Sequence, residues 1–481
     1  MASTAASRLG LAWIRVRDSL WFIPGLSVVA GSALAIVAVR IPSPTFDGTT
    51  AGFWIFGGGS EGARGVLTAI AGGLITVTGT IFSVTIIALQ LASSQFTPRL
   101  LRSFVADRVN QSVLGIFIGT FTYTLLVLRT VRSEADDRVS FVPHVGVTLA
   151  LALLLVSIGG LIVFINHAAQ SIRASVILHR ESRRILEVVD DLFPSHIGHP
   201  SAHGGAQPPI ASDGHAWPAD APALVGAERS GYLQSVHADA LWELGKSDAA
   251  PRSGVISIRM ELHIGEFAFP GKPIAAIWPA GALDDRVERA VRDAFVLGPD
   301  RTPEQDLEYG LVELSDIAVK ALSPGINDPT TAAQAIDRLV EVLAALASRV
   351  PPDSVRSSPD GGVRLLARHT QFDRATGLAF DQIRHFGADN PGIATVLLER
   401  MLDLASVVPA HLLPVVGEQV AAITRAARRA IVDSGDLRRL EPLAARALQA
   451  TITPPPAAPP SAAPSILAAP APPPPAGRRR P

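Results

Sequence analysis

Residues 66–92 read VLTAIAGGLITVTGTIFSVTIIALQLA and contain no charged side chain. As a helix, this stretch would extend about 40 Å at about 1.5 Å per residue, which exceeds the hydrocarbon core of a bilayer, about 30 Å thick. The helix should therefore tilt, or continue beyond the hydrocarbon until Pro98 ends it. The stretch predicts a protein built on membrane-spanning helices.

Three more apolar stretches are long enough to cross a bilayer as helices, which requires about 20 residues. They cover approximately residues 20–39, 112–128 and 141–165. The first stretch follows several arginines, as the core of a signal peptide would, but Arg40 and Pro42 follow it in place of a small-residue cleavage site. We therefore predict four spans in a transmembrane domain over residues 20–165, with the first span retained as an anchor.

The composition agrees with a membrane part joined to a soluble part. Of the 481 residues, 48% are hydrophobic and only 18% are charged, and the mean hydropathy is +0.31. The net charge of −1 gives no basic footprint for nucleic acid. Because the sequence contains no cysteine, it excludes disulfides, thiolate metal sites, iron–sulfur clusters and cysteine nucleophiles.

The arginines that flank the four spans predict the orientation in the membrane. The N-terminus, the loop between spans two and three, and the segment after span four carry Arg8, Arg15, Arg17, Arg99, Arg102, Arg108, Arg173, Arg180, Arg183 and Arg184. The two remaining loops carry Arg40, Arg64, Arg129, Arg132 and Arg138. Because basic residues are enriched in cytoplasmic loops, we predict that both termini and the whole chain after Ile165 are cytoplasmic.

One face of the second span is polar. At about 100° per residue, a single narrow stripe holds Ala69, Gly72, Thr76, Thr80, Ser83, Gln90 and Ser94. Two interpretations are open, because small and hydroxyl residues let membrane helices pack closely and can also face water in a pore. No span contains Asp, Glu or Lys, which counts against a proton-coupled transporter.

Several motifs resemble those of one known family. They are ALQLASSQFTPRLLRSFVADRVNQSVLGIFIGTFTYTLLVLRTV (residues 88–131), SGYLQSV (230–236), GEFAFPGKPIA (265–275) and ALSPGINDPTTA (321–332), in this order. Over about residues 15–435, the chain resembles the bacterial predicted membrane proteins designated domain of unknown function 2254, although Phe96-Thr97 stands where we expect Tyr-Ser. The resemblance implies a multi-pass protein of the bacterial cytoplasmic membrane with a cytoplasmic C-terminal half. It implies no catalytic residues.

Outside the spans we expect an α+β cytoplasmic region with a small β module and a helical bundle. The predicted segments are a cytoplasmic N-terminus (1–19), a stalk helix continuing span four (166–193), a flexible linker (194–226), the β module (227–280), the helical domain (281–450) and a disordered proline-rich tail (451–481). The expected helices of the helical domain are 283–297, 303–322, 329–349, 372–386, 391–408 and 412–434.

Two features invite a cofactor or a metal, and neither supports one. The β module is similar to the barrel-sandwich hybrid of biotinyl and lipoyl domains, but Lys246, the only lysine between its half-motifs, lacks the hairpin setting for modification. The linker histidines fit no zinc spacing and have no acidic or cysteine partners. They are His196, His199, His203 and His215. We expect no cofactor and no metal.

The stretch KALSPGINDPTT, residues 320–331, has a structural and a functional interpretation. As a helix junction, Pro324 and Gly325 end one helix, and Asp328 caps the next, with Pro329 at its first position. As a ligand or subunit-contact loop, it would place polar side chains around the free N–H groups of the second helix. The candidate residues are Asp316, Lys320, Ser323, Asn327 and Asp328.

The sequence contains no P-loop, no H-E-x-x-H and no G-x-S-x-G motif, and we predict no enzyme. Our leading hypothesis is an oligomeric channel or pore-like protein with a cytoplasmic regulatory domain. The alternatives are a membrane-anchored sensor or scaffold that binds a ligand or partner, and, third, an enzyme at the membrane face. A channel would place the span-two stripe on a hydrated axis, whereas a scaffold would bury it within one protomer. The expected partners are the lipid bilayer and further copies of the chain, and not nucleic acid.

Overall fold

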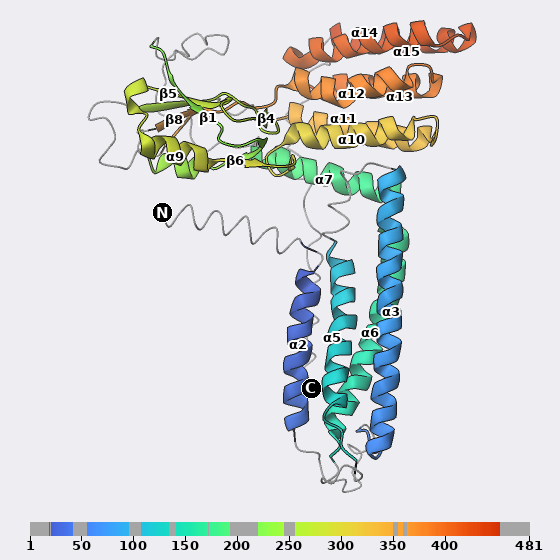
Figure 1. The fold of residues 1–481 in the computed structure, drawn as a ribbon. Helices are drawn as coiled ribbons and strands as arrows, with labels where there is room; N and C mark the ends of the chain where they lie inside the picture. The colour runs from blue at the N-terminus through green and yellow to red at the C-terminus, as the bar shows by residue number, and fades with distance from the viewer. Residues whose placement is uncertain are drawn as a thin grey trace, which may run out of the picture.

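The computed structural model describes most of the chain. The described residues are 19, 21–41, 55–95, 107–133, 141–171, 173–192, 220–244, 255–349, 355–358 and 363–452. The predicted N-terminal segment, flexible linker and proline-rich tail lie for the most part outside them, as do Lys246, His196, His199, His203 and His215. Figure 1 shows an upright group of helices, with the C-terminal region (the described residues from 173 on) lying across one end of it.

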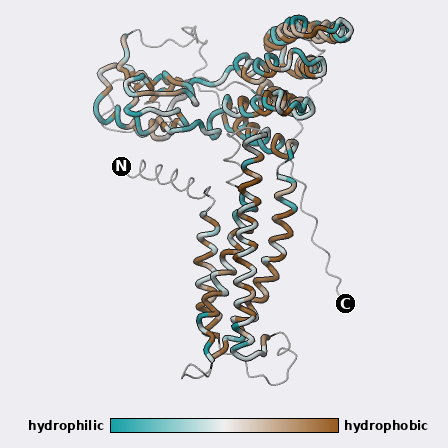
Figure 2. Tube along the Cα trace, turned by 45° about the vertical axis from the view of Figure 1, so that its right-hand side comes forward, coloured by the Kyte–Doolittle hydropathy of each residue, from teal (hydrophilic) through white to brown (hydrophobic). Residues whose placement is uncertain are grey.

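Four long apolar helices form the upright group. They are α2 (Phe22–Arg40), α3 (Ser60–Gln95), α5 (Arg108–Leu128) and α6 (His144–Ser171). All four have the length and composition of membrane spans, which confirms the four predicted spans, and Figure 2 shows hydrophobic residues along each of them. With 36 residues, α3 is longer than its predicted span and extends about 54 Å, well beyond a hydrocarbon core of about 30 Å.

α5 contacts each of the other three membrane helices. Its closest approach is to α2, where glycines face the neighbouring backbone. A Cβ atom on Gly119 would lie 2.9 Å from the carbonyl oxygen of Ser27, and one on Gly31 would overlap the carbonyl of Gly119. Small residues at this crossing let the two backbones touch, which is how membrane helices gain packing contacts without a hydrophobic driving force.

Polar contacts join α5 to α6. The Tyr123 hydroxyl is buried and donates a hydrogen bond of 2.8 Å to the carbonyl oxygen of Gly146. At the end near the C-terminal region, the carboxylate of Asp107, which caps α5, lies 2.9 Å from Nε2 of His167 on α6. Hydrogen bonds of this kind between membrane helices determine which faces meet.

The chain turns between α6 and α7 (Ala174–Leu192), so the predicted straight stalk over residues 166–193 is wrong. α7 instead lies across the end of the membrane helices and packs against α10 (Leu307–Ala321) and α11 (Pro329–Ala347) (Figure 1). The physical reason is the apolar stripe of α7, which would face water in a straight stalk and is buried against these two helices. This stripe consists of Ile177, Leu178, Ile185, Val188 and Val189.

The C-terminal helices form layers on α7, which we call, together with α7, the helical stack. Above α10 and α11 lie α12 (Phe372–Gly387) and α13 (Pro391–Val407), and above these lie α14 (Leu413–Ala430) and α15 (Ser434–Ile452) (Figure 1). A short 3-10 helix, Ala410–Leu412, precedes α14. The helices α10 to α14 correspond to expected helices, whereas α15 was not among them.

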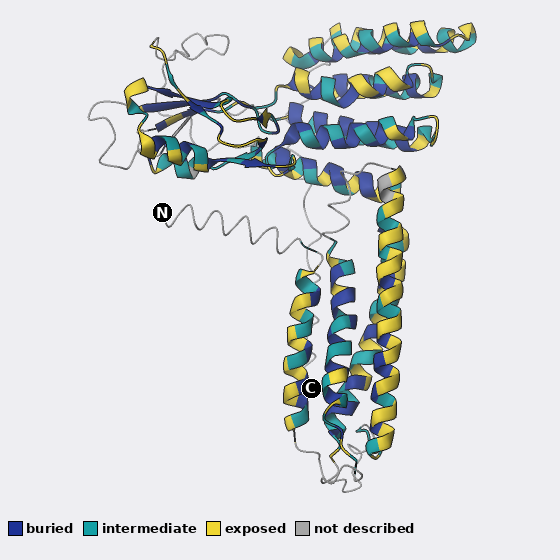
Figure 3. Ribbon diagram, in the orientation of Figure 1, coloured by how far each residue is buried: buried dark blue, intermediate teal, exposed yellow. Residues whose placement is uncertain are grey.

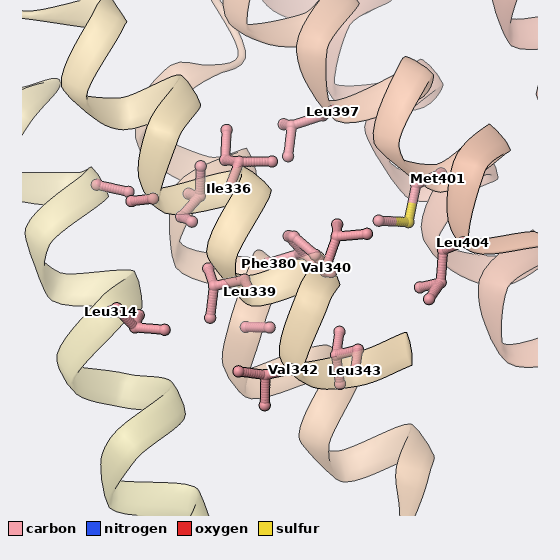
Figure 4. Close-up of a cluster of buried hydrophobic side chains, with 14 of the residues drawn as sticks. Leu314, Ile336, Leu339, Val340, Val342, Leu343, Phe380, Leu397, Met401 and Leu404 are labelled. Carbon is pink, nitrogen blue, oxygen red and sulfur yellow. The ribbon is translucent and has the colours of Figure 1, made fainter. Parts of the chain in front are cut away.

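One apolar core runs through the helical stack. Figure 4 shows Leu339 and Leu343 of α11 beside Phe380, Leu397 and Met401 from the next layer. Burying a side chain of this size stabilises the folded state by about 1.5–3 kcal/mol relative to exposure. Leu89 of α3 also packs against this core, so the helical stack touches the membrane helices at a place other than the turn before α7.

A β region lies beside the helical stack (Figure 1). Its strands are β1 (Ala223–Gly226), β2 (Gly231–Val236), β3 (Ile256–Met260), β4 (Phe267–Ala268), β5 (Pro273–Trp278), β6 (Phe295–Gly298), β7 (Val355–Ser357) and β8 (Val363–Leu366). They form a five-stranded sheet of order β1-β5-β3-β8-β7 and a three-stranded sheet of order β4-β2-β6. The helices α8 (Ala238–Trp242) and α9 (Asp285–Ala294) and a 3-10 helix (Ala280–Ala282) complete the region.

The predicted β module at 227–280 is too short. It omits β1, β6, β7 and β8, and β8 pairs in parallel with β3 although it lies between α11 and α12 in the sequence. The expected helix 283–297 ends at Ala294 because the next residues pair with β2. The expected helix 303–322 begins only at Leu307, where Asp306 caps it. Strands this short show too little alternation to be recognised between helices.

We expect Gly119→Val to destabilise the membrane helices by about 1–3 kcal/mol, because the added methyl groups overlap Ser27 of α2. Thermal unfolding of the purified protein in detergent measures this as a lower Tm. Gly159→Val on α6 is the matched control, since nothing lies within 4 Å of a Cβ at that position. Equal loss of stability in the two variants would contradict the close crossing of α2 and α5.

Candidate functional site

α3 has a packed face and an outer face. The packed face carries the buried side chains of Leu67, Ile70, Leu74 and Ile81, which contact the neighbouring membrane helices. The opposite face of the same helix is exposed along its length. Which residues lie on that outer face decides what α3 can contact beyond its own chain.

The predicted stripe lies on the outer face. Its five candidate residues, all exposed, are Thr76, Thr80, Ser83, Gln90 and Ser94. Packing within one protomer therefore does not account for the stripe. Three of its hydroxyls bond to their own helix. Thr76 Oγ1 donates to the carbonyl oxygen of Gly72 (2.9 Å), Thr80 Oγ1 to that of Thr76 (3.2 Å) and Ser94 Oγ to that of Leu91 (3.0 Å). The amide of Gln90 makes no hydrogen bond within the described part of the chain.

The outer face also carries a regular repeat that the sequence analysis missed. Gly65, Ala69, Gly72, Thr76, Gly79 and Ser83 follow one another at alternating steps of four and three residues. Cβ atoms added to the three glycines meet nothing within 4 Å, so the chain itself does not use this small-residue seam. Such spacing is that of a left-handed helix pair, and small residues in it let two membrane helices come close together.

The outer faces of α2 and α6 are different. Figure 3 shows exposed residues along the upright helices, and on α2 and α6 many are large and apolar, as contact with lipid tails requires. They include Leu26, Val29 and Val37 on α2 and Leu155, Ile158, Ile162 and Val163 on α6. On α3, exposed apolar side chains such as Ile75 and Phe82 lie beside the small-residue seam, and Ile87 follows it before Gln90. α3 thus adds a stripe of small and polar residues to an exposed apolar surface of the kind that α2 and α6 carry.

The second predicted site, around residues 320–331, forms a tight junction between α10 and α11. The Asp328 carboxylate caps α11, accepting from the hydroxyl of Thr331 (2.6 Å) and from its N–H (3.0 Å), and these bonds lower the pKa of Asp328. Ser323 Oγ donates to the carbonyl oxygen of Lys320 (2.7 Å). Asn327 has a backbone φ of +50°, in the left-handed region that Asn enters more readily than most residues.

These contacts are those of a helix junction. They account for Ser323, Asn327 and Asp328 without a ligand, while Asp316 is half-buried on α10 and Lys320 is exposed at its end. The junction lies at the end of α10 away from the β region (Figure 1). The ligand-loop interpretation of these residues stays a prediction.

A cavity of about 150 Å³ lies where the β region meets the helical stack, and we call it the junction cavity. Leu192 at the end of α7, Met260 of β3 and Leu365 of β8 form part of its apolar wall. Its polar lining consists of His263, Gln305, Asp306, Glu308, Arg368, His369 and Thr370. Within the described residues, no group of three or more His, Asp or Glu side chains could hold a metal ion.

An arginine holds each of the two buried carboxylates of the junction cavity. Asp306 is 3% exposed and accepts hydrogen bonds of 2.8 Å from both Nε and Nη2 of Arg301. Glu308 is 6% exposed and accepts from Nε (2.5 Å) and Nη2 (2.8 Å) of Arg374 on α12. Burial raises the pKa of Asp306, and the guanidinium of Arg301 opposes that rise. Paired in this way, the two carboxylates bind the start of α10 to its surroundings.

The turn after β3 approaches the first of these pairs. Gly265 has a φ of +82°, and a Cβ there would overlap both the Asp306 carboxylate and the Arg301 guanidinium. Only glycine can adopt this positive φ and also avoid the overlap with Asp306 and Arg301. The turn therefore brings His263 to the wall of the junction cavity.

His263 and Arg368 are the lining side chains that are charged or titratable and have no hydrogen-bond or ion-pair partner among the described residues. The ring of His263 makes no hydrogen bond to another described residue. Burial lowers the pKa of His263, and Arg368 lowers it further, against the opposing influence of Glu308. Both effects favour the neutral form of the imidazole. Arg368 is exposed and has no carboxylate within ion-pairing distance among the described residues.

Sequence reasoning missed the junction cavity because its residues come from distant parts of the chain. They lie at 192, 236–238, 260–264, 305–308 and 365–370. No one of these segments is a motif, and only the parallel pairing of β3 with β8 brings the third and the last together. The available signal was the pair Arg368-His369 shortly before a predicted helix, which gains meaning only once that pairing is known.

Comparison with known proteins gives a family and no activity. The model of a family described as "Predicted membrane protein (DUF2254)" matches residues 17–403. The chain is similar to uncharacterized protein Mb1321c of Mycobacterium bovis and to uncharacterized protein Rv1290c of Mycobacterium tuberculosis. Each is 35% identical over 446 residues, covering 91% of this chain and 82% of the relative. No solved structure matches the chain.

We expect Asn327→Ala to lower the free energy of unfolding by about 1 kcal/mol, because alanine in the left-handed region costs about 1–2 kcal/mol. Asn327→Gly should be neutral or stabilising, since glycine has no Cβ to clash. Thermal unfolding of the two variants measures the difference. An alanine variant as stable as the wild type would favour the ligand-loop interpretation, because the backbone conformation would then not explain Asn327.

We also expect His263→Gln to reduce the pH dependence of stability. The pKa of His263 in the folded protein lies below the usual value of about 6.5, so the unfolded chain takes up a proton first as the pH falls. The stability that this group contributes is complete above about pH 6.5 and is lost as the pH falls through that value towards the folded pKa. Thermal unfolding at two pH values, about 7.5 and 5.5, should show a larger loss in the wild type than in the variant.

The control for this measurement is His411→Gln, at an exposed histidine outside the junction cavity. It should leave the pH dependence of the Tm close to that of the wild type. The assigned surroundings of His263 are wrong if the two variants respond to pH in the same way.

Proposed function

We propose a function on one established premise: this chain belongs to the DUF2254 family of predicted membrane proteins. The proposed function is that of an oligomeric, channel-like membrane protein, in which α3 of each copy faces the symmetry axis. The helical stack and the β region would form its regulatory domain on the cytoplasmic side.

The outer face of α3 is the observation that carries this proposal. It combines an exposed stripe of small and polar residues with exposed apolar side chains such as those of Ile75, Phe82 and Ile87, whereas the exposed residues in the middle of α2 and α6 are all apolar. A lipid-facing helix gains nothing from Thr, Ser and Gln side chains, and an amide such as that of Gln90 is costly in hydrocarbon without a partner. Facing water around an axis shared by several copies would satisfy the Gln90 amide, which has no partner within the described residues.

A second candidate follows from the small-residue seam. Its alternating steps of four and three residues would let the α3 helices of two copies pack directly against each other, with no water between them. The protein would then be a dimeric membrane anchor for a sensor or scaffold. The two candidates share the same helix face and differ in whether that face is hydrated.

The proposed cytoplasmic orientation is supported by the basic residues at the end of the membrane helices where α7 lies. Among the described residues, this end carries Arg108, Arg173, Arg180, Arg183 and Arg184. In the sequence, further arginines precede α2 and lie between α3 and α5. Basic residues accumulate on the cytoplasmic side of membrane proteins.

The natural absence of cysteine makes a direct test possible. We expect single cysteines at Thr76→Cys and Ser83→Cys to react, in intact membranes, with a charged thiol reagent that does not dissolve in lipid. The reason is that only a hydrated face ionises a thiol and admits a charged reagent. Mass spectrometry of the purified variants gives the labelled fraction. Ile162→Cys on the apolar outer face of α6 is the matched control and should stay unlabelled.

The same variants separate the two candidates. A closed α3 pair would give oxidative disulfide dimers at Thr76→Cys or Ser83→Cys without labelling, since disulfides need Cα atoms within about 7 Å. Labelling of the α3 variants at the level of the α6 control, with no cross-linked dimer, would contradict both candidates.

A further inference from the structure

The junction cavity lies where three parts of the chain meet, and the proposed function leaves it without a role. Leu192 is the last residue of α7, which connects to the membrane helix α6. Val236 and Met260 belong to the β region, and Leu307 begins α10. An occupant of the cavity would therefore contact the β region, the helical stack and the helix that leads to the membrane at once.

Among the described charged residues around the junction cavity, one cation has no carboxylate partner. The two lining carboxylates are each paired with an arginine, as described above. Glu266, the other carboxylate that acts on His263, is paired with Lys272 at 2.8 Å. Arg368 is the lining cation without such a partner in the described part of the chain. The cavity is therefore suited to an anion.

The chemistry of the polar lining narrows the kind of anion. A guanidinium offers parallel N–H donors that match the two oxygens of a carboxylate. The ring of His263, which lines the cavity together with Arg368 and makes no hydrogen bond to another described residue, can donate one further hydrogen bond. Because arginines hold both lining carboxylates, no free carboxylate is left in the lining to repel a bound anion.

The rest of the lining is apolar. It includes Leu192, Val236, Met260, Ile264 and Leu365. An inorganic anion would leave this surface against water, whereas an organic acid with a short hydrocarbon body would cover it. A volume of about 150 Å³ holds roughly ten waters at about 10–15 Å³ each, which is the size of a small metabolite.

We propose that the junction cavity binds a small organic carboxylate, with its charged group at Arg368 and His263 and its apolar body against the hydrophobic wall. The site does not depend on whether α3 lines a pore. It gives the C-terminal region a ligand that joins the β region to the helical stack.

Isothermal titration of the purified full-length protein in detergent tests this proposal, with sodium hexanoate as the probe. We expect saturable binding that weakens about tenfold or more in Arg368→Gln, because a hydrogen-bonded charge contributes about 1.5–3 kcal/mol. Hexanamide has the same body without the charge. It should bind to the wild-type protein no more tightly than hexanoate binds to Arg368→Gln. Inorganic phosphate, which has the charge without the body, should bind more weakly than hexanoate.

Two further variants show whether a loss of binding is caused by misfolding. Arg364→Gln removes an exposed arginine of β8 outside the cavity and should bind hexanoate like the wild type. Ala367→Leu fills part of the cavity and should abolish binding while the protein elutes from size exclusion as before. The proposal is overturned by an absence of hexanoate binding, by equal affinity in Arg368→Gln, or by tighter binding of phosphate or hexanamide.

Discussion

The contact between the apolar face of α7 and the first layer of the helical stack determines how the membrane part and the C-terminal region are joined. Ile177, Ile185 and Val189 enter the same core as residues of α10 and α11. Gly310 of α10 gives room to Ile185, since a Cβ there would overlap that side chain. An amphipathic helix is stable only where its apolar face is covered, so α7 lies across the membrane helices and not in line with them. Every later layer is then placed on α7.

The sequence predicted those elements whose signals are local. Long apolar stretches identified the membrane helices, and the step Asp328-Pro329 marked the start of α11, where Asp328 caps the helix. The direction of α7 could not be predicted, because a periodic pattern reveals an apolar face but not the surface that covers it. The strands β6 and β8 escaped recognition because four residues carry almost no alternation, and their partners lie elsewhere in the chain.

The two candidate sites also differ in how far the sequence alone could predict them. A polar face on α3 could be read from helical spacing, whereas its exposure depends on which side α5 and α6 cover. The junction cavity exists only in the folded chain, where buried ion pairs fix its geometry. Pairs such as Asp306 with Arg301 contribute little net stability after desolvation, but an unpaired carboxylate there would be strongly unfavourable. They therefore hold the start of α10 in one arrangement beside the β region.

The parallel pairing of β3 with β8 has a consequence for how this chain can be made. Ser257 and Arg364 lie opposite each other in the sheet but 107 positions apart in the polypeptide, with α10 and α11 between them. During translation, β3 leaves the ribosome long before its neighbour and presents an unpaired backbone edge until β8 emerges. No single cut of the polypeptide can therefore release the β region and the helical stack as two independently folding pieces.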